Sequence, residues 1–360
     1  MTTAPAAIHS LKSDEKLALK ILSPPLLTHA SRLGCWTDIR DELMAGKLTK
    51  WLNTPYFVGE IEAETVASMS LFAATDAPEV GLVEFVHTAE QHRRKGIASI
   101  LLAQLIESFK AQGGKALYLC TTNPLAGALY EKHGFWYTVG DGMRYLAPEA
   151  RNFDQTYLAF CGRATVRTAT WSDLPRAAVL YNHDQPDWFI KEYLTQCFHD
   201  TRFESHFVEL KRRTENQRGV FLALENPHGR LVGTAAVERS DTFYEQHVGT
   251  LSFRIHPTYF DQTTELLQAT AGRARELSIT VLQVYLAACD AKQKDLLTAA
   301  GFDLEARLCG RLCHAGEKMD LLVYTLSLAG ETPRFSRGDY YGNRKTWQEE
   351  RLAGQGKTHC

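Results

Sequence analysis

The sequence predicts an α+β protein made of two similar domains in tandem. Its 360 residues, 44% hydrophobic and 23% charged, have the composition of a soluble globular protein and exceed what one ordinary core organises. Strand-like apolar runs alternate with stretches of helical periodicity in each half of the chain. The order of these elements in the first half returns in the second half.

Three apolar runs begin the pattern of the first half. They cover residues 56–58, 66–72 and 80–86, include β-branched residues, and are separated by Gly, Asp and Pro. Such runs predict consecutive strands of an antiparallel meander.

A helix is expected after this meander. Apolar residues repeat at helical spacing over 97–109, and Gly113-Gly114 supplies the stop. A short strand over 116–120 and a helix over about 125–132, ended by Gly134, complete the first half.

The second half repeats this order. The pattern predicts a strand over 250–255, a helix over about 264–277, a strand over 280–287 and a final helix closed by Gly301-Phe302.

Two dipeptides support an internal duplication. Tyr118-Leu119 and Gly134-Phe135 recur 167 residues later as Tyr285-Leu286 and Gly301-Phe302, with no gap needed. Two anchors at one offset, together with the shared order of elements, indicate that the second half is a copy of the first.

A new domain start is visible near residue 163. A strand-like run there meets Ser172 and Asp173, residue types suited to cap a helix that runs through Val179. Both ends of the chain lack an apolar period and have the character of extensions. The predicted organisation is a flexible N-terminus (1–15), a catalytic domain (16–162), a degenerate second domain (163–330) and a C-terminal extension (331–360).

The charge balance excludes several partners. Lys and Arg number 40 against 42 Asp and Glu, a net charge of -2, so no global field attracts nucleic acid or an anionic membrane. The first ten residues lack the basic start of a signal peptide, and no run of about 18 uncharged apolar residues occurs. We therefore expect a cytoplasmic protein without nucleic-acid or membrane partners.

The eight cysteines do not predict a metal site. They are scattered and none forms a Cys-x-x-Cys pair, so we interpret them as reduced thiols. Cys309, Cys313 and His314 lie close together, but a zinc site needs four ligands and no second cluster is near.

An anion site is predicted where the third strand meets the following helix. The segment there reads Arg93-Arg94-Lys95-Gly96-Ile97-Ala98. Unpaired amides and the helix dipole favour a phosphate at a helix start, Gly96 lets the backbone approach closely, and the basic side chains add charge-assisted hydrogen bonds. By itself this segment could also be an ordinary basic helix start.

A second motif thirty residues on makes the pattern specific. Residues 122–135 read TNPLAGALYEKHGF. Together the two motifs resemble the GNAT superfamily of acyl-CoA-dependent N-acetyltransferases, over roughly residues 16–162. The resemblance implies two tandem GNAT-like domains, each a mixed, mostly antiparallel twisted sheet flanked by helices.

The resemblance also assigns a binding site for acetyl-CoA or another acyl-CoA, with no metal required. Arg93, Gly96 and Ala98 match the pyrophosphate-binding pattern of the family, and Asn123 would bond the pantetheine arm. The implied coenzyme-binding residues are Val86, Thr88, Arg93, Arg94, Lys95, Gly96, Ile97, Ala98, Asn123, Ala126 and Tyr130.

Two side chains are predicted to move protons. Tyr130 would lie by the thioester sulfur in the family, and a phenol with a pKa of about 10 can protonate the departing thiolate. Glu84 is the leading candidate for the base that deprotonates the amine, because strand alternation places it opposite Val83 and Phe85. His87 is a second candidate, and a structural role remains open for each of them.

The acceptor amine would be held by the first helices and the late hairpin, as is usual in this family. Four residues in or near these segments could supply a carboxylate and aromatic faces, although some of them could belong to the core. They are Trp36, Asp38, Tyr118 and Trp136.

The second copy has lost this chemistry. The 167-residue offset places Thr263 and Glu265 at the positions of Gly96 and Ala98, and Leu297 at that of Tyr130. A glutamate would repel a pyrophosphate and a side chain would block the backbone approach. We interpret residues 164–330 as a degenerate domain that braces the first, completes its acceptor cleft or forms a homodimer.

The sequence thus predicts transfer of an acetyl group from acetyl-CoA to a primary amine of a small molecule, in a ternary complex. Two alternatives stay open: a CoA-binding sensor or scaffold without turnover, and another acyl-CoA reaction such as decarboxylation or transfer to a carrier-protein thiol.

Overall fold

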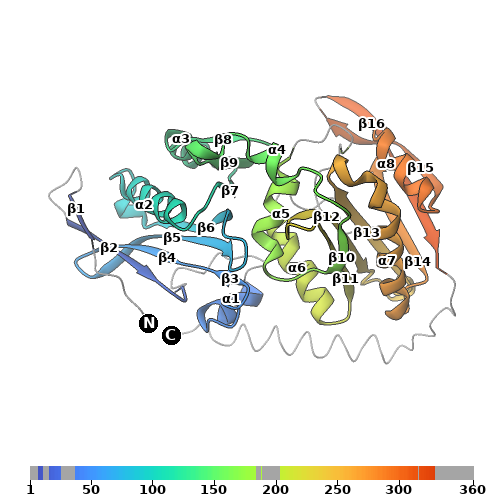
Figure 1. Cartoon of the computed structure of the whole chain (residues 1–360), viewed down its shortest axis with the longest axis horizontal. Helices are drawn as coiled ribbons and strands as arrows, with labels where there is room; N and C mark the ends of the chain where they lie inside the picture. The colour runs from blue at the N-terminus through green and yellow to red at the C-terminus, as the bar shows by residue number, and fades with distance from the viewer. Residues whose placement is uncertain are drawn as a thin grey trace.

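The computed structural model describes residues 7–10, 16–25, 37–183, 188, 203–314 and 316–328. They form two mixed sheets, one in each half of the chain, both flanked by helices (Figure 1). The predicted α+β class is confirmed, because each half of the chain holds a mixed, mostly antiparallel sheet flanked by helices. The expected C-terminal extension, 331–360, lies outside the described residues.

The first sheet has nine strands in the order β1-β2-β4-β5-β6-β7-β9-β8, with β3 paired to β5. Only β6 and β7 pair in parallel; the other described pairs of this sheet are antiparallel. Its strands are β1 (Ala7–Ser10), β2 (Lys16–Leu22), β3 (Leu52–Asn53), β4 (Tyr56–Ile61), β5 (Glu64–Ala74), β6 (Val80–Thr88), β7 (Ala116–Cys120), β8 (Phe135–Tyr137) and β9 (Gly142–Leu146).

The second sheet has seven strands in the order β10-β11-β12-β13-β14-β16-β15, and its parallel pair is β13 with β14. Its strands are β10 (Thr165–Thr168), β11 (Gly219–Glu225), β12 (Leu231–Arg239), β13 (Val248–Ile255), β14 (Val281–Ala287), β15 (Asp303–His314) and β16 (Glu317–Ser327).

The described α-helices are short or of moderate length, and most lie between strands. They are α1 (Thr37–Met44), α2 (Ile97–Ala111), α3 (Pro124–Lys132), α4 (Phe153–Tyr157), α5 (Asp173–Tyr181), α6 (Phe203–Glu215), α7 (Thr263–Glu276) and α8 (Ala291–Ala299). The predicted meander of the first half and the helix and strand positions of both halves agree with these elements.

The 167-residue offset also holds in three dimensions. It carries α3 (124–132) onto α8 (291–299) without change of length. Each helix is followed by a glycine in the left-handed conformation, Gly134 with φ 85° and Gly301 with φ 91°. Because each half also has one parallel strand pair at the same place, the two halves share one topology.

Helix α5 is packed between the two sheets (Figure 1). It contacts β5 and β6 of the first sheet and β12 and β13 of the second. All nine of its residues are buried, as expected for a helix with protein on every side. One hydrophobic cluster therefore runs through both halves, from Phe72 and Leu82 to Leu180 and Phe221.

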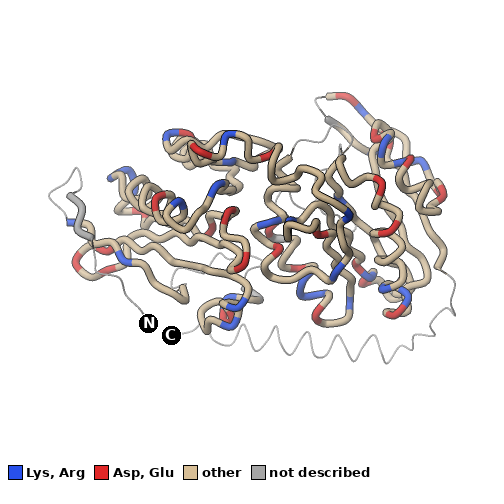
Figure 2. The backbone as a smooth tube through the Cα atoms, in the orientation of Figure 1, with Lys and Arg blue, Asp and Glu red and all other residues tan. Residues whose placement is uncertain are grey.

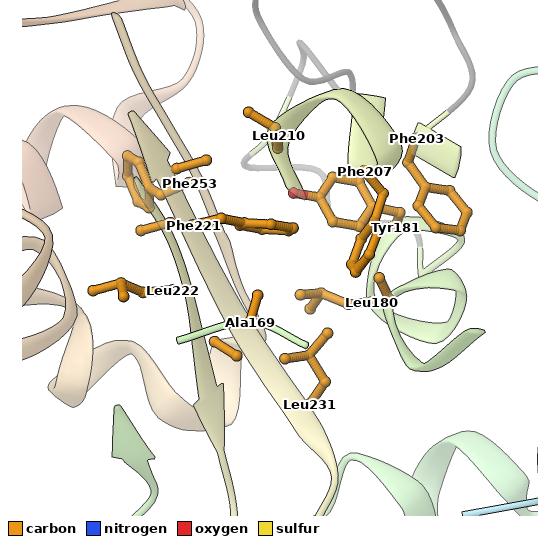
Figure 3. Close-up of a cluster of buried hydrophobic side chains, with 14 of the residues drawn as sticks. Ala169, Leu180, Tyr181, Phe203, Phe207, Leu210, Phe221, Leu222, Leu231 and Phe253 are labelled. Atoms are coloured by element: carbon orange, nitrogen blue, oxygen red, sulfur yellow. The ribbon is translucent and has the colours of Figure 1, made fainter. Parts of the chain in front are cut away.

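Figure 3 shows the second-half part of this cluster, where Leu180 and Tyr181 of α5 face Phe203 and Phe207 of α6. Phe207 also meets Phe221 of β11 at a ring-centroid separation of 5.0 Å. A second, smaller cluster lies between α2 and the opposite face of the first sheet.

Asp173 does not cap α5 in the way the sequence suggested. Its carboxylate is fully buried, bonds both terminal nitrogens of Arg167 at 2.6 and 2.7 Å, and accepts from the amide of Thr170. The side chain thus points back to β10 instead of forward over the first turn of the helix.

Charged residues of both signs are interspersed over the described chain (Figure 2). Within the described residues, no helix combines the length and apolar character needed to cross a membrane.

Candidate active site

The basic segment between β6 and α2 forms a tight turn. A 3-10 turn at Glu90–His92 leads into Arg93, which is extended, and Arg94, which has φ 63°. Arg93 Nε donates to the carbonyl oxygen of Thr88 at 3.0 Å, so this guanidinium folds back to the end of β6. Arg93 and Arg94 are exposed, and their positive charges surround the start of α2.

Gly96 occupies the N-cap position of α2 with φ 87°. A Cβ added to Gly96 would meet no atom within 4 Å, so the backbone here faces open space. Glycine is required by the conformation rather than by crowding. An open, positively charged helix start fits a diphosphate, because amides of the first turn can donate to its oxygens.

Asn123 begins α3. Its Oδ1 accepts from the amide of Leu125 at 3.0 Å, which makes it the N-cap, and its own amide donates to Oγ1 of Thr121. Since Asn123 is exposed and Ala126 half-buried, the predicted contact with a pantetheine arm would use the amide group or the neighbouring backbone.

Tyr130 lies on the inner face of α3. Its side chain is 5% exposed and belongs to the cluster beneath α2. Its ring meets Phe135 at 5.7 Å, and Phe135 meets Tyr145 at 5.6 Å on another side. The phenol is thus held in place by packing on the α2 side of the sheet.

A β-bulge in β6 changes the expected directions of two side chains. The β5–β6 ladder pairs Ser70 with Glu84 and Ser68 with His87, so Phe85 and Val86 together oppose one residue. Phe85 has φ 54° and meets Phe72 at 5.6 Å. The prediction that Glu84 lies opposite both Val83 and Phe85 is therefore wrong for Phe85, because a bulge breaks strict alternation.

Glu84 itself lies on the α5 face. Its neighbour two residues back, Leu82, belongs to the cluster that contains α5, whereas Val83 belongs to the cluster beneath α2. Glu84 is 9% exposed. Hence Glu84 and Tyr130 approach the sheet from opposite faces.

The two parallel strands separate at this point. Within the described strands, β6 and β7 pair from Val80 with Ala116 to Leu82 with Tyr118, although both continue further. Two residues on, Glu84 and Cys120 occupy the same level across the gap between the strands. Groups on the α2 face and groups on the α5 face can meet in this gap.

The backbone of the bulge adjoins the same gap. Val86 is 37% exposed although apolar, and Thr88 pairs with Ala67 of β5. Phe85 and Val86 fall outside the ladder to β5. The use of backbone groups from Val86 and Thr88 for coenzyme binding stays a prediction.

The four residues predicted to hold the acceptor amine differ in burial and in whether the structure describes them. Trp36 and the side chain of Asp38 lie outside the described residues. Tyr118 is fully buried in the cluster around α5, and burial raises its pKa, while Arg144 counteracts part of the rise. A side chain with no accessible surface has no room to contact an acceptor, so Tyr118 is a core residue.

Trp136 keeps a position suited to ligand contact. It is 41% exposed, and the guanidinium of Arg144 lies 5.0 Å from the centroid of its ring. Arg144 is in turn fixed by Asp154, whose two carboxylate oxygens both lie 2.7 Å from Nη1. Sequence analysis missed Arg144 and Asp154, because nothing in their spacing signals that the fold pairs them.

The corresponding positions of the second half carry different side chains. Thr263, at the position of Gly96, is fully buried, and Glu265, at that of Ala98, lies 2.5 Å from Arg163. Leu297, at that of Tyr130, is also fully buried. Among the described residues, no group of three or more His, Cys, Asp or Glu side chains is placed to hold a metal ion.

Comparison with solved structures identifies several acetyltransferases with a similar fold. The yncA protein of Salmonella typhimurium, solved with its cofactor acetyl-CoA, is 19% identical, with 49% of this chain and 99% of that chain covered and a TM-score of 0.41. A phosphinothricin acetyltransferase from Sinorhizobium meliloti in complex with AcCoA is 16% identical (49% and 95% covered, TM-score 0.39). A ribosomal-protein-alanine N-acetyltransferase from Brucella melitensis is 23% identical (46% and 99% covered, TM-score 0.38).

A family match locates the resemblance in the chain. No curated protein matches the sequence. Residues 27–135 match the model of the acetyltransferase (GNAT) family. This range contains the basic turn, Gly96, Asn123 and Tyr130. The similarity to the acetyltransferase (GNAT) family therefore lies in the first half of the chain.

Proposed function

We propose that the protein transfers an acetyl group from acetyl-CoA to a primary amine of a small molecule, in the first half of the chain. The observation that carries this proposal is the arrangement around the gap between β6 and β7. The open turn at Gly96 and the phenol of Tyr130 lie on the α2 side, and the carboxylate of Glu84 lies on the other.

This arrangement suits direct transfer. Acetyl-CoA, bound by the basic turn and the Asn123 segment, would place its thioester in the gap. The amine nitrogen forms a bond to the carbonyl carbon while the carbon–sulfur bond breaks. Glu84 accepts the proton lost by nitrogen, directly or through water, and Tyr130 donates its proton to the sulfur and is reprotonated from solvent.

The first test measures release of the CoA thiol from acetyl-CoA with a panel of amines: lysine, spermidine, kanamycin and a lysine-containing peptide. The wild type is compared with Tyr130→Phe, Gly96→Glu and the matched control Tyr145→Phe, whose ring also packs on Phe135. Amine-dependent release that falls about 100-fold in Tyr130→Phe but not in Tyr145→Phe would support the proposal.

Other outcomes favour other functions. Tight CoA binding without release by any amine, abolished by Gly96→Glu, would favour a sensor. Release with a carrier-protein thiol in place of an amine would favour the other acyl-CoA chemistry. Either result would contradict the proposal.

A further inference from the structure

The face of the first sheet that carries Glu84 is covered by α5, which comes from the second half of the chain. Coenzyme binding is assigned to the opposite side, where the Gly96 turn begins α2. An acceptor that meets the thioester in the gap between β6 and β7 must therefore approach from the α5 side. The residues at the end of α5 are thus candidates to line its path.

The end of α5 reaches the level of Glu84. Thr138 donates from Oγ1 to Oδ1 of Asn182, the residue after α5, at 2.9 Å. A Cβ on Gly142 would lie 2.2 Å from the same Oδ1, so Asn182 rests directly on this glycine. Gly142 pairs with Cys120, which occupies the level of Glu84 across the gap.

Asn182 also lies on the same face of the first sheet as Glu84. Gly142 lies two residues before Arg144 on β9, and Cys120 lies two residues after Tyr118 on β7; Arg144 and Tyr118 are themselves a cross-strand pair. Tyr118 belongs to the cluster around α5, so Gly142 and Cys120 are on that same face of the sheet. Asn182 therefore lies beside the gap on the side of Glu84.

Both polar atoms of the Asn182 side chain form hydrogen bonds within the protein, because its Nδ2 also donates to the carbonyl oxygen of Ala178 at 2.9 Å. The next residue, His183, is half-buried. The fully buried Arg254 of β13 donates to the carbonyl oxygens of Leu180 and His183, at 3.2 and 2.8 Å. The imidazole of His183 meets that of His256 at 4.9 Å.

We infer that the second half of the chain supplies a wall of the acceptor site and that His183 is a specificity-determining residue in it. Its imidazole forms a hydrogen bond with a polar group of the amine substrate. Asn182 and Arg254 are positioning residues, because Asn182 docks the end of α5 on Gly142 and Arg254 holds the carbonyl oxygen of His183. A domain that has lost its own chemistry thus selects the substrate of its neighbour. This inference rests on the proposed function.

The test uses full-length protein and the amine of the panel that gives the fastest CoA release. In His183→Ala, the KM for this amine should rise about tenfold or more, while the KM for acetyl-CoA stays within about twofold. Asn182→Ala should shift the same constant by a smaller factor. His228→Ala, an exposed histidine on the β11–β12 turn, should change neither.

The outcomes separate the inference from the proposed function. An unchanged amine KM in His183→Ala, or an equal rise in both constants, would overturn the inference while the transferase activity of the wild type stands. A wild type that releases no CoA with any amine overturns both. If His183→Ala fails to bind acetyl-CoA by calorimetry, His183→Gln is judged by the same criteria.

Discussion

The side chain of Ser99, in the first turn of α2, lies 2.7 Å from Nε2 of His133, the residue that ends α3. This hydrogen bond joins the helix that begins at the phosphate turn to the helix that carries Tyr130. Burial lowers the pKa of His133, and Lys132 lowers it further, so the imidazole is neutral at neutral pH and can accept from the hydroxyl.

His133→Ala or Ser99→Ala should therefore raise the KM for acetyl-CoA by about 3- to 10-fold, the value of one hydrogen bond. The reason is that α2 and α3 would no longer be held at one separation. Steady-state kinetics would show it, with Ser108→Ala at the far end of α2 as the control. Equal effects of Ser99→Ala and Ser108→Ala would contradict this role.

Gly96→Ala should weaken acetyl-CoA binding at least tenfold. The substitution strains a residue with φ 87° and adds a methyl group where the backbone faces open space. Gly113, with φ 84° and equally open surroundings at the other end of α2, is the matched control. Both variants should lose about 1 kcal/mol of unfolding free energy, but calorimetry should detect weaker binding only in Gly96→Ala.

His256 should make stability depend on pH. Burial and, to a smaller extent, the nearby His183 lower its pKa from 6.5 to about 4, while Asp154 opposes part of the shift. Its Nδ1 also lies 2.7 Å from Oγ1 of Thr258. Because the unfolded chain binds the proton more readily, the contribution of this group is complete above pH 6.5 and is lost as the pH falls towards 4.

Urea unfolding of the wild type at pH 6.5 and pH 5 should show a loss of about 1–2 kcal/mol from this group. His256→Asn should remove that part of the loss, whereas the exposed His228→Asn should not. A pH dependence that is the same in all three proteins would rule out His256 as the source.

Replacing Arg176 should lower the free energy of unfolding more than replacing Asp76, its ion-pair partner in the first half of the chain. It is 5% exposed and lies 2.8 Å from Asp76 of the first half, and also 3.5 Å from Asp173 and 3.6 Å from Glu225. Arg176→Ala leaves the buried carboxylate of Asp173 with less compensation and should cost about 3 kcal/mol. Asp76 is 61% exposed, so Asp76→Ala should cost less than about 1 kcal/mol.

Equilibrium unfolding in urea measures both variants. Similar losses for Arg176→Ala and Asp76→Ala would mean that the interdomain ion pair, rather than the buried carboxylate of Asp173, determines the effect.

Much of the fold could be predicted because local patterns specify it. Apolar runs, helical periodicity and the glycines at 134 and 301 gave the elements and their repetition. The bulge at Phe85 could not be predicted, because it depends on how β6 pairs with β5. That pairing also decides which face a side chain takes after the bulge.

Some residues of the candidate site could likewise be located from the sequence, and others could not. The basic turn and the segment with Asn123 and Tyr130 are contiguous motifs, so they could be located from the sequence, and their roles in coenzyme binding and catalysis stay predictions. Tyr118 was misassigned because a strand residue beside a motif can face either the core or a ligand. Asn182 and His183 were missed because their importance arises only when α5 packs across the first sheet, far from its place in the chain.

Helix α5 makes the two halves dependent on each other during evolution. Under the proposed function the first half performs the chemistry, so substitutions at Thr263, Glu265 and Leu297 of the second half should be tolerated if the fold is kept. A substitution that shortens or charges α5 exposes apolar surface on both sheets at once, including that under Phe72 and Leu82. Selection is therefore expected to preserve α5 more strictly than those three positions, and neither half is expected to persist as a separate gene product.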